Sequence, residues 1–123
     1  MRNTLLVLLS VAAVSLGRVA ESRPKLGLPQ TEFDFGLVPQ NAKVTYRFQI
    51  KSEGTDTLRI ERVVPGCGCT QAPLEKNLVA PGDSTFLEIV FATGSFVGSV
   101  RKTPTIQTNE TIVSQILKFR AFV

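Results

Sequence analysis

The amino-acid sequence predicts an all-β fold, an immunoglobulin-like β-sandwich of about seven short strands. Two observations support this prediction. Apolar and polar side chains alternate along several segments, for example Val44–Ile50 ("VTYRFQI"), which is the pattern of a strand with one buried face. Beyond the N-terminal segment, no window of about twelve residues shows the 3.6-residue period of an amphipathic helix.

The predicted strands follow one another with turn signals between them. We expect them at residues 32–38, 44–51, 57–64, 87–91, 100–108 and 117–123, with a weak extra strand at 78–79. Pro81 and Gly82 suit the centre of a type II turn, because proline fixes the first φ and glycine accepts a positive second one. Pro104 cannot donate a ladder hydrogen bond, so we expect its strand to be bulged there or to lie at a sheet edge.

The same alternation predicts which side chains point into the core. They are Phe35, Val44, Phe48, Ile50, Leu58, Ile60, Leu87, Ile89, Phe91, Leu117 and Phe119. A domain of this size should bury roughly 60–65% of the surface that its unfolded chain exposes. We therefore expect it to fold without help from a disulfide.

The N-terminal residues 1–22 predict a secretory signal peptide. A short basic head precedes the apolar run Leu5–Leu16, and small residues then recur at the spacing that a signal peptidase reads. Cleavage is expected after Gly17 or after Ser22. The apolar run is shorter than the roughly 20 residues that span a bilayer. We therefore predict a periplasmic or secreted protein with no integral membrane segment in the mature chain.

One domain is expected after the signal peptide, because 123 residues are enough for one ordinary domain. Residues 23–29 are interpreted as an extended leader, since two prolines and a glycine disfavour a helix there. Residues 30–123 are interpreted as the β-sandwich domain.

Composition argues against several classes of function. The chain has no histidine, which removes the commonest general base and the commonest metal ligand together. A net charge of +4, scattered along the chain, does not form the basic patch of a nucleic-acid-binding protein. No nucleophile or phosphate-loop motif is present. We therefore predict a protein that is not an enzyme, that takes no cofactor and that binds no nucleic acid.

Several short motifs resemble those of the bacterial domain-of-unknown-function 1573 family, in the same order. They are "FDFGLV" (33–38), "VTYRFQIKSEGTDTLRI" (44–60), "CGCT" (67–70), "APGDS" (80–84) and "GSVRK" followed by "QTN" (98–109). The resemblance implies an exported immunoglobulin-like domain with no established biochemical activity. Asn41 stands where this family usually has glycine in the first turn, and asparagine tolerates the positive φ that such a turn needs.

Cys67 and Cys69 are the only cysteines, and three interpretations of the pair remain open. They could form a tight structural corner between strands, which we favour. They could form a labile disulfide, since export favours oxidation but a bridge between residues i and i+2 closes a very small ring. They could also hold a soft metal such as Cu(I), although the mature chain supplies neither histidine nor methionine as a further ligand.

The most plausible function is that of an exported, non-catalytic binding or scaffolding module. Its partner is expected to be another envelope protein, bound by pairing with an open sheet edge or by the loops at one end of the sandwich. The alternative is a periplasmic thiol-redox or soft-metal-binding protein that uses Cys67 and Cys69. A reactive thiol would need a nearby cation, and Arg62 is the closest candidate before the pair in the sequence.

Overall fold

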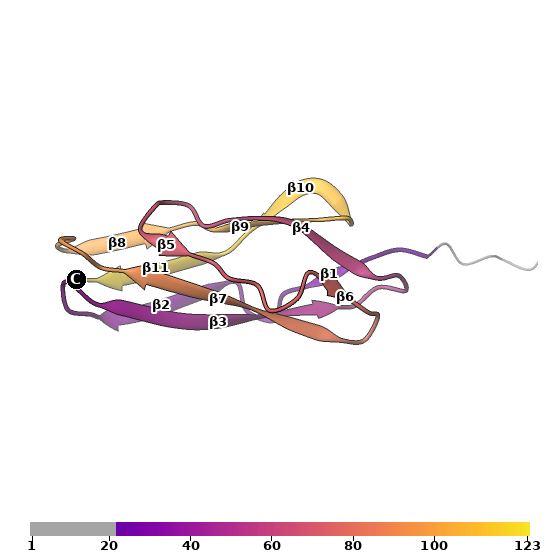
Figure 1. Cartoon of the computed structure of the whole chain (residues 1–123), viewed down its shortest axis with the longest axis horizontal. Helices are drawn as coiled ribbons and strands as arrows, with labels where there is room; N and C mark the ends of the chain where they lie inside the picture. The colour runs from indigo at the N-terminus through magenta and orange to yellow at the C-terminus, as the bar shows by residue number, and fades with distance from the viewer. Residues whose placement is uncertain (1–21) are drawn as a thin grey trace, which may run out of the picture.

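The computed structural model describes residues 22–123, and within this range the chain is all-β, with eleven strands and no helix (Figure 1). The strands are β1 (Leu26–Gly27), β2 (Glu32–Leu37), β3 (Lys43–Ser52), β4 (Leu58–Val64), β5 (Thr70–Gln71), β6 (Leu78–Val79), β7 (Ser84–Ala92), β8 (Ser99–Lys102), β9 (Thr105–Thr108), β10 (Thr111–Ile116) and β11 (Lys118–Phe122). The predicted signal peptide lies outside the described residues, apart from Ser22. No helix in the described part is long and apolar enough to cross a membrane.

The strands form three hydrogen-bonded sheets, ordered β1-β3-β7-β5, β10-β9-β4-β6 and β2-β11-β8. The longest pairing is antiparallel and joins β3 to β7, from Lys43 opposite Ala92 to Lys51 opposite Ser84. The one parallel pairing among these described strands joins β2 to β11, close to the two ends of the domain in sequence. In Figure 1 the strands run along the long axis of the molecule, with β3 on one side and β4, β9 and β10 on the other.

The core lies between these sheets and contains the side chains that the alternation predicts. Phe48, Ile50, Leu58, Ile60, Leu87, Ile89, Phe91, Leu117 and Phe119 are buried, whereas Phe35 and Val44 are half-buried and pack against them. Four further apolar residues complete the core, namely Val79, Val100, Ile106 and Ala121. Burial of this alternating set provides the main driving force for folding.

The expected strand at 100–108 is divided at Thr103–Pro104 into β8 and β9, which belong to different sheets. β8 lies at the edge of its sheet, but β9 lies inside its sheet, between β10 and β4. Pro104 is buried, and its carbonyl oxygen accepts a hydrogen bond from the N–H of Leu117 at 2.8 Å. Because proline donates no hydrogen bond, the ladder is interrupted there, and the strand changes sheets instead of bulging.

Three strands were not expected from the sequence. β1 and β5 have only two residues each, too few for an alternating pattern. β10 has six residues, but all of them are exposed, so it has no buried face to leave a period-two signal.

The leader at 23–29 is extended, as expected, but it is also part of the sheet. β1 pairs with the end of β3, and the N–H of Glu53 donates to the carbonyl oxygen of Lys25 at 2.9 Å. Gly54 allows this close approach, because a Cβ atom at this position would collide with the backbone of Arg23 and Lys25.

Candidate functional site

Cys67 and Cys69 lie at the corner that connects β4 to β5, and the structure joins them in a disulfide with their Cα atoms 5.3 Å apart. The N–H of Cys69 donates a hydrogen bond to Cys67 Sγ at 3.1 Å. The hydroxyl of the buried Thr70 lies 3.7 Å from Cys67 Sγ and 3.6 Å from Cys69 Sγ. Two donors therefore face the sulfur atoms, and both cysteines are half-buried.

This corner also positions β5 on the edge of β7. The carbonyl oxygen of Cys69 accepts a hydrogen bond from the N–H of Ala92 at 2.9 Å, and Thr70 then pairs with Phe91. The Cys69 side chain packs against the core. Because Cys67 and Cys69 share a disulfide, neither of their sulfur atoms is a free thiolate that could bind a metal in this state.

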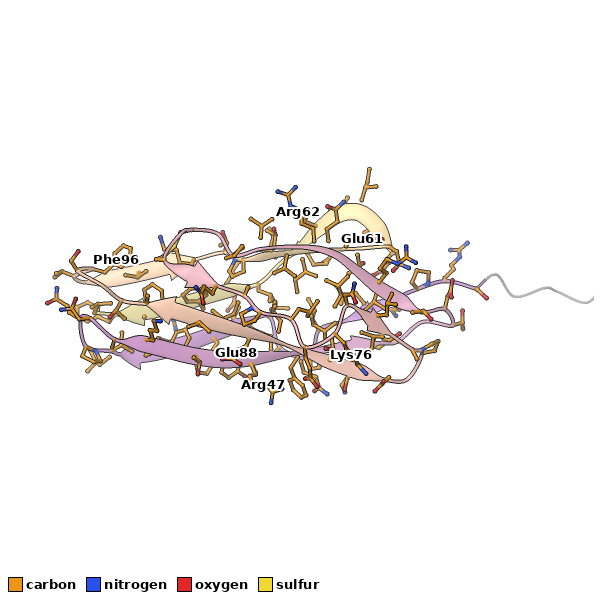
Figure 2. The ribbon with its side chains drawn as sticks, viewed as in Figure 1. Arg47, Glu61, Arg62, Lys76, Glu88 and Phe96 are labelled. Carbon is orange, nitrogen blue, oxygen red and sulfur yellow. A yellow bond between two sulfur atoms is a disulfide. The ribbon has the colours of Figure 1, made fainter. Side chains whose placement is uncertain are left out.

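Apart from these two donors, the surroundings of the disulfide supply little that would activate a thiol. Arg62 points outward from β4 in Figure 2, and it makes no ion pair or hydrogen bond with this corner among the described interactions. Within residues 22–123, no group of three or more His, Cys, Asp or Glu side chains could hold a metal ion.

A second candidate site is the outer edge of β10. No strand within residues 22–123 pairs with this edge, and β10 rises as an arch above β9 in Figure 1. The arch is a bulge, because the register with β9 shifts between Thr111 and Gln115. Its large apolar side chains are exposed to solvent, at 89% for Ile112, 63% for Val113 and 54% for Ile116.

The other terminal strands of the three sheets are short or carry charge. β1, β5 and β6 have two residues each. β2 carries the acidic residues Glu32 and Asp34, and β8 carries the basic residues Arg101 and Lys102. Short length and charged side chains both protect a sheet edge from pairing with another chain. In contrast, β10 has six residues and no charge.

A groove of about 400 Å³ separates β10 from the start of β2. Val113 and Ile116 provide its apolar lining, and Glu32 and Lys118 add one negative and one positive charge to the lining. The groove is open to solvent and continuous with the exposed β10 arch. Together the arch and the groove form a surface that a partner strand or side chain could cover.

A larger hollow of about 590 Å³ lies over the sheet of β2, β11 and β8. Acidic and basic side chains pair across its strands: Arg120 Nε lies 2.9 Å from Asp34 Oδ2, and Lys118 Nζ lies 3.8 Å from Glu32 Oε1. The N–H of Gly36, which donates to Asp34, and the Arg120 guanidinium hold the pKa of this carboxyl group below its ordinary value. These pairs match two of the four basic side chains that line the hollow, and Arg101 and Lys102 on β8 leave it with an excess of two positive charges.

The two site residues that the sequence predicts, Cys67 and Cys69, are thus brought together, whereas the β10 surface was missed. One signal could have revealed it. Residues 111–117 carry no charge and no proline, yet they contain four large apolar side chains in a chain otherwise rich in charged strands. Such an uncharged run is unusual for an exposed strand.

Comparisons with known proteins identify a family and a fold. The family model described as "Protein of unknown function (DUF1573)" matches residues 26–123. A comparison with curated proteins gives no match.

Three solved structures resemble this chain. A protein of unknown function from Porphyromonas gingivalis W83 has a TM-score of 0.72 and 18% identity, and the alignment covers 89% of this chain and 51% of that one. The Vibrio cholerae VesB protease has a TM-score of 0.64 and 10% identity, with 82% and 32% covered. The Bacteroides ovatus GH5 xyloglucanase in complex with a XXXG heptasaccharide has a TM-score of 0.53 and 10% identity, with 80% and 19% covered.

The chain therefore spans about half the length of the P. gingivalis protein and smaller parts of the two enzymes. At such low identities the likeness concerns the fold alone.

Proposed function

The chain belongs to the DUF1573 family of proteins of unknown function, and from this premise we propose that it is an exported, non-catalytic module that binds protein. The domain is assigned an immunoglobulin-like sandwich fold. Antiparallel pairing of β3 with β7, sheets on two sides of one core, and short exposed connections support this assignment. Export is supported by the signal-peptide pattern at residues 1–22.

The ionisable groups support a non-catalytic role. A catalytic acid or base usually sits in a cleft with a pKa moved toward neutrality. Asp34 and Asp83 instead have lowered pKa values and are exposed beside Arg120 and Lys76, as expected for surface ion pairs. The complete absence of histidine in the sequence points the same way.

The observation that carries the proposal is the free edge of β10. An unpaired strand edge presents main-chain donors and acceptors that a strand from another protein can complete, while neighbouring apolar side chains provide contact area. Among the terminal strands within residues 22–123, β10 is the one that combines a length of six residues, the absence of charge and exposed large apolar side chains. The partner is another protein of the cell envelope that contributes an extended segment to this edge.

Site-specific photo-cross-linking in producing cells tests this function. A photoreactive residue replaces Ile112 in one strain, and Val97, another apolar residue that is 80% exposed, in the control strain. We expect a discrete protein adduct from position 112 and none from position 97. An adduct pattern that is the same at both positions, or turnover of a substrate by the purified protein, would overturn the proposal.

A thiol-redox role for Cys67 and Cys69 is the second candidate function. It is favoured by the donors at the disulfide, because the N–H of Cys69 and the hydroxyl of Thr70 would stabilise a thiolate at Cys67 after reduction. Intact mass before and after mild reductant, followed by alkylation, tests this role. A pair that resists mild reductant would exclude it, and a pair that reduces and reoxidises readily would support it.

A further inference from the structure

We propose that the hollow over β2, β11 and β8 is a second binding surface, and that its ligand is an extended acidic segment of another protein. Two carboxylate side chains of this segment, separated by one residue, occupy the hollow. The hollow meets the groove beside β10 at Glu32 and Lys118, but it lies on a different sheet. This inference therefore goes beyond the proposed function and does not depend on pairing at the β10 edge.

The hollow carries more positive than negative charge. Its charged lining consists of Glu32, Asp34, Arg101, Lys102, Lys118 and Arg120. The two acidic residues already pair with the two basic residues of β11. Arg101 and Lys102 of β8 have no acidic partner among the described ion pairs. β8 is the terminal strand of its sheet, and no strand within residues 22–123 pairs with its other edge to supply an acid.

Two arginines lie side by side on the outer face of this sheet. Arg101 of β8 is directly opposite Arg120 of β11, and both side chains are exposed. Like charges at directly opposite positions destabilise a sheet. Arg120 Nε donates to Asp34 Oδ2 at 2.9 Å, which leaves its terminal N–H groups without a described acceptor. The Arg101 side chain takes part in none of the described hydrogen bonds or ion pairs. A carboxylate between the two guanidinium groups would relieve their repulsion and accept their hydrogen bonds.

A second cationic position follows along β11. Lys118 Nζ lies 3.8 Å from Glu32 Oε1, a loose contact between two exposed side chains, and an ammonium group has three donors. Lys102 Nζ lies 5.3 Å from the centre of the Phe96 ring, which attracts the ammonium group but does not neutralise its charge. Both lysines line the hollow, so a second carboxylate would find donors there.

The spacing of these positions matches an extended chain. Lys118 and Arg120 are two residues apart on β11, which places them on one face about 6.7 Å apart. An extended peptide has the same period, so its residues i and i+2 point to one side at the same separation. A segment with two acidic residues at these places would bring one carboxylate to Arg101 and Arg120 and the other to Lys118. Its two negative charges equal the excess of positive charge in the hollow.

The acidic residues of β2 favour a narrow ligand over a broad anionic surface. Glu32 and Asp34 are exposed on the same face as the arginines. A membrane rich in anionic lipid would cover β2 as well and would be repelled by these carboxylates. A single extended chain can follow β8 and β11 and stay clear of β2.

NMR titration tests the binding. The exported protein, labelled with ¹⁵N, is titrated with the acetylated and amidated peptide Ser-Glu-Ser-Glu-Ser at about 0.15 M salt, where long-range attraction is screened. We expect saturable shifts of the amide signals of Arg101, Lys118 and Arg120. The absence of saturable shifts, or shifts centred on residues 111–116 instead, would overturn the proposal.

A charge removal and its matched control test the site. Arg101→Gln should raise the dissociation constant about threefold or more, because it removes one of the two guanidinium groups. Arg62→Gln removes the same charge from an exposed position on β4 that does not line the hollow, and it should leave the constant unchanged. Equal weakening by both changes would show only a general attraction to a basic protein and would overturn the site.

A gain of affinity gives a readout that misfolding cannot produce. Asp34→Asn should lower the dissociation constant about threefold, because it removes a competing carboxylate beside Arg120. Asparagine keeps an oxygen that can accept the N–H of Gly36, as Asp34 Oδ1 does. Glu61→Gln, on the outward face of β4 in Figure 2, is the control and should leave the constant unchanged. Failure of Asp34→Asn to tighten binding would contradict the proposal.

Two further ligands test the spacing and the class of partner. The isomeric peptide Ser-Glu-Glu-Ser-Ser has the same charge, but its adjacent glutamates point to opposite sides of an extended chain, so it should bind about threefold or more weakly. Equal binding of the two peptides would overturn the spacing. Vesicles of phosphatidylglycerol should not bind the protein at the same salt concentration. Vesicle binding that Arg101→Gln abolishes would overturn a protein segment as the ligand.

The two proposals can fail separately. If neither peptide binds and position 112 still gives a protein adduct in cells, the acidic-segment inference is overturned and the proposed function stands. If the peptide binds in the hollow and position 112 gives no adduct, the β10 edge is overturned and the hollow stands.

Discussion

Gly54 shows how one residue determines where the start of the domain lies. The turn between β3 and β4 passes so close to residues 23–25 that a Cβ atom on Gly54 would collide with the carbonyl oxygen of Arg23 and the nitrogen of Lys25. Those atoms belong to the backbone, so they cannot rotate away as the end of a flexible side chain would. The N–H of Thr55 also donates to the carbonyl oxygen of Arg23 at 2.9 Å. The glycine is therefore required by the attachment of the leader.

Gly54→Ala should displace residues 23–27 and destabilise the domain by about 1–3 kcal/mol, as overpacking usually does. Chemical denaturation measures the loss, and hydrogen exchange at Glu53 and Thr55 shows whether the leader has detached. Gly68→Ala is the matched control, because a Cβ atom there would meet no atom within 4 Å. An equal loss in both variants would refute this explanation.

The disulfide at Cys67 and Cys69 closes a loop of three residues, so it restricts the unfolded chain very little. We expect the double variant Cys67→Ser, Cys69→Ser to fold and to lose about 1 kcal/mol or less of unfolding free energy. Urea denaturation of both proteins measures the difference. A loss of several kcal/mol would show that the corner is essential for the pairing of β5 with β7.

At the scale of elements, exposed ion pairs join neighbouring segments at the surface. Lys76, just before β6, reaches Asp83, just before β7, with 2.7 Å between Nζ and Oδ2. The N–H of Ser84 donates to Asp83 Oδ1 at 2.8 Å. The Lys76 hydrogen bond and this N–H lower the pKa of Asp83 from its ordinary value near 3.8. Folding therefore favours the charged carboxylate.

A lowered pKa in the folded state gives a contribution to stability that is present above pH 3.8 and is lost as the pH falls through the folded pKa of Asp83. Asp83→Asn should therefore reduce the difference in melting temperature between neutral and acidic pH. Because the pair is exposed, the effect should be small and should shrink with added salt. Glu61→Gln, on the outward face of β4 in Figure 2, is the control and should leave the difference unchanged.

At the scale of the whole molecule, β11 joins β2 to the rest of the core. It pairs with β2 in parallel and with β8 in antiparallel, so residues far apart in the sequence meet around Phe119. The Phe119 ring lies 5.6 Å from that of Phe35 and 5.4 Å from that of Phe91, measured between centroids. Phe119 thus packs β2, β7 and β11 against one another.

Phe119→Ala should cost about 3–5 kcal/mol, because it removes a buried aromatic ring and leaves a cavity where three strands meet. Phe122→Ala, on the same strand but 54% exposed, should change stability by less than about 1 kcal/mol. Thermal and urea denaturation of both variants measure the contrast. Similar losses of stability in the two variants would show that the buried Phe119 ring is not what packs β11 against β2 and β7.

The sequence by itself determined the features that depend on neighbouring residues. Alternation along residues 44–50 and 87–91 predicted two strands and their buried faces, because successive side chains in a strand point to opposite sides. Local conformations followed in the same way. Gly82 has the positive φ of 81° that the predicted turn needs, and Asn41 has a φ of 53° where glycine is usual in the family. Each of these properties is decided within a few residues.

Only the tertiary structure decided which strands pair. The division of residues 100–108 between two sheets, the parallel pairing of β2 with β11 and the joining of the leader to β3 all involve segments distant in the sequence. The two candidate sites show the same contrast. Cys67 and Cys69 are close because only one residue separates them in the sequence. The free edge of β10 depends on the tertiary structure, because among the described strands β10 pairs with β9 alone. A strand's own pattern specifies its buried face, whereas its partner is chosen by packing against the whole core.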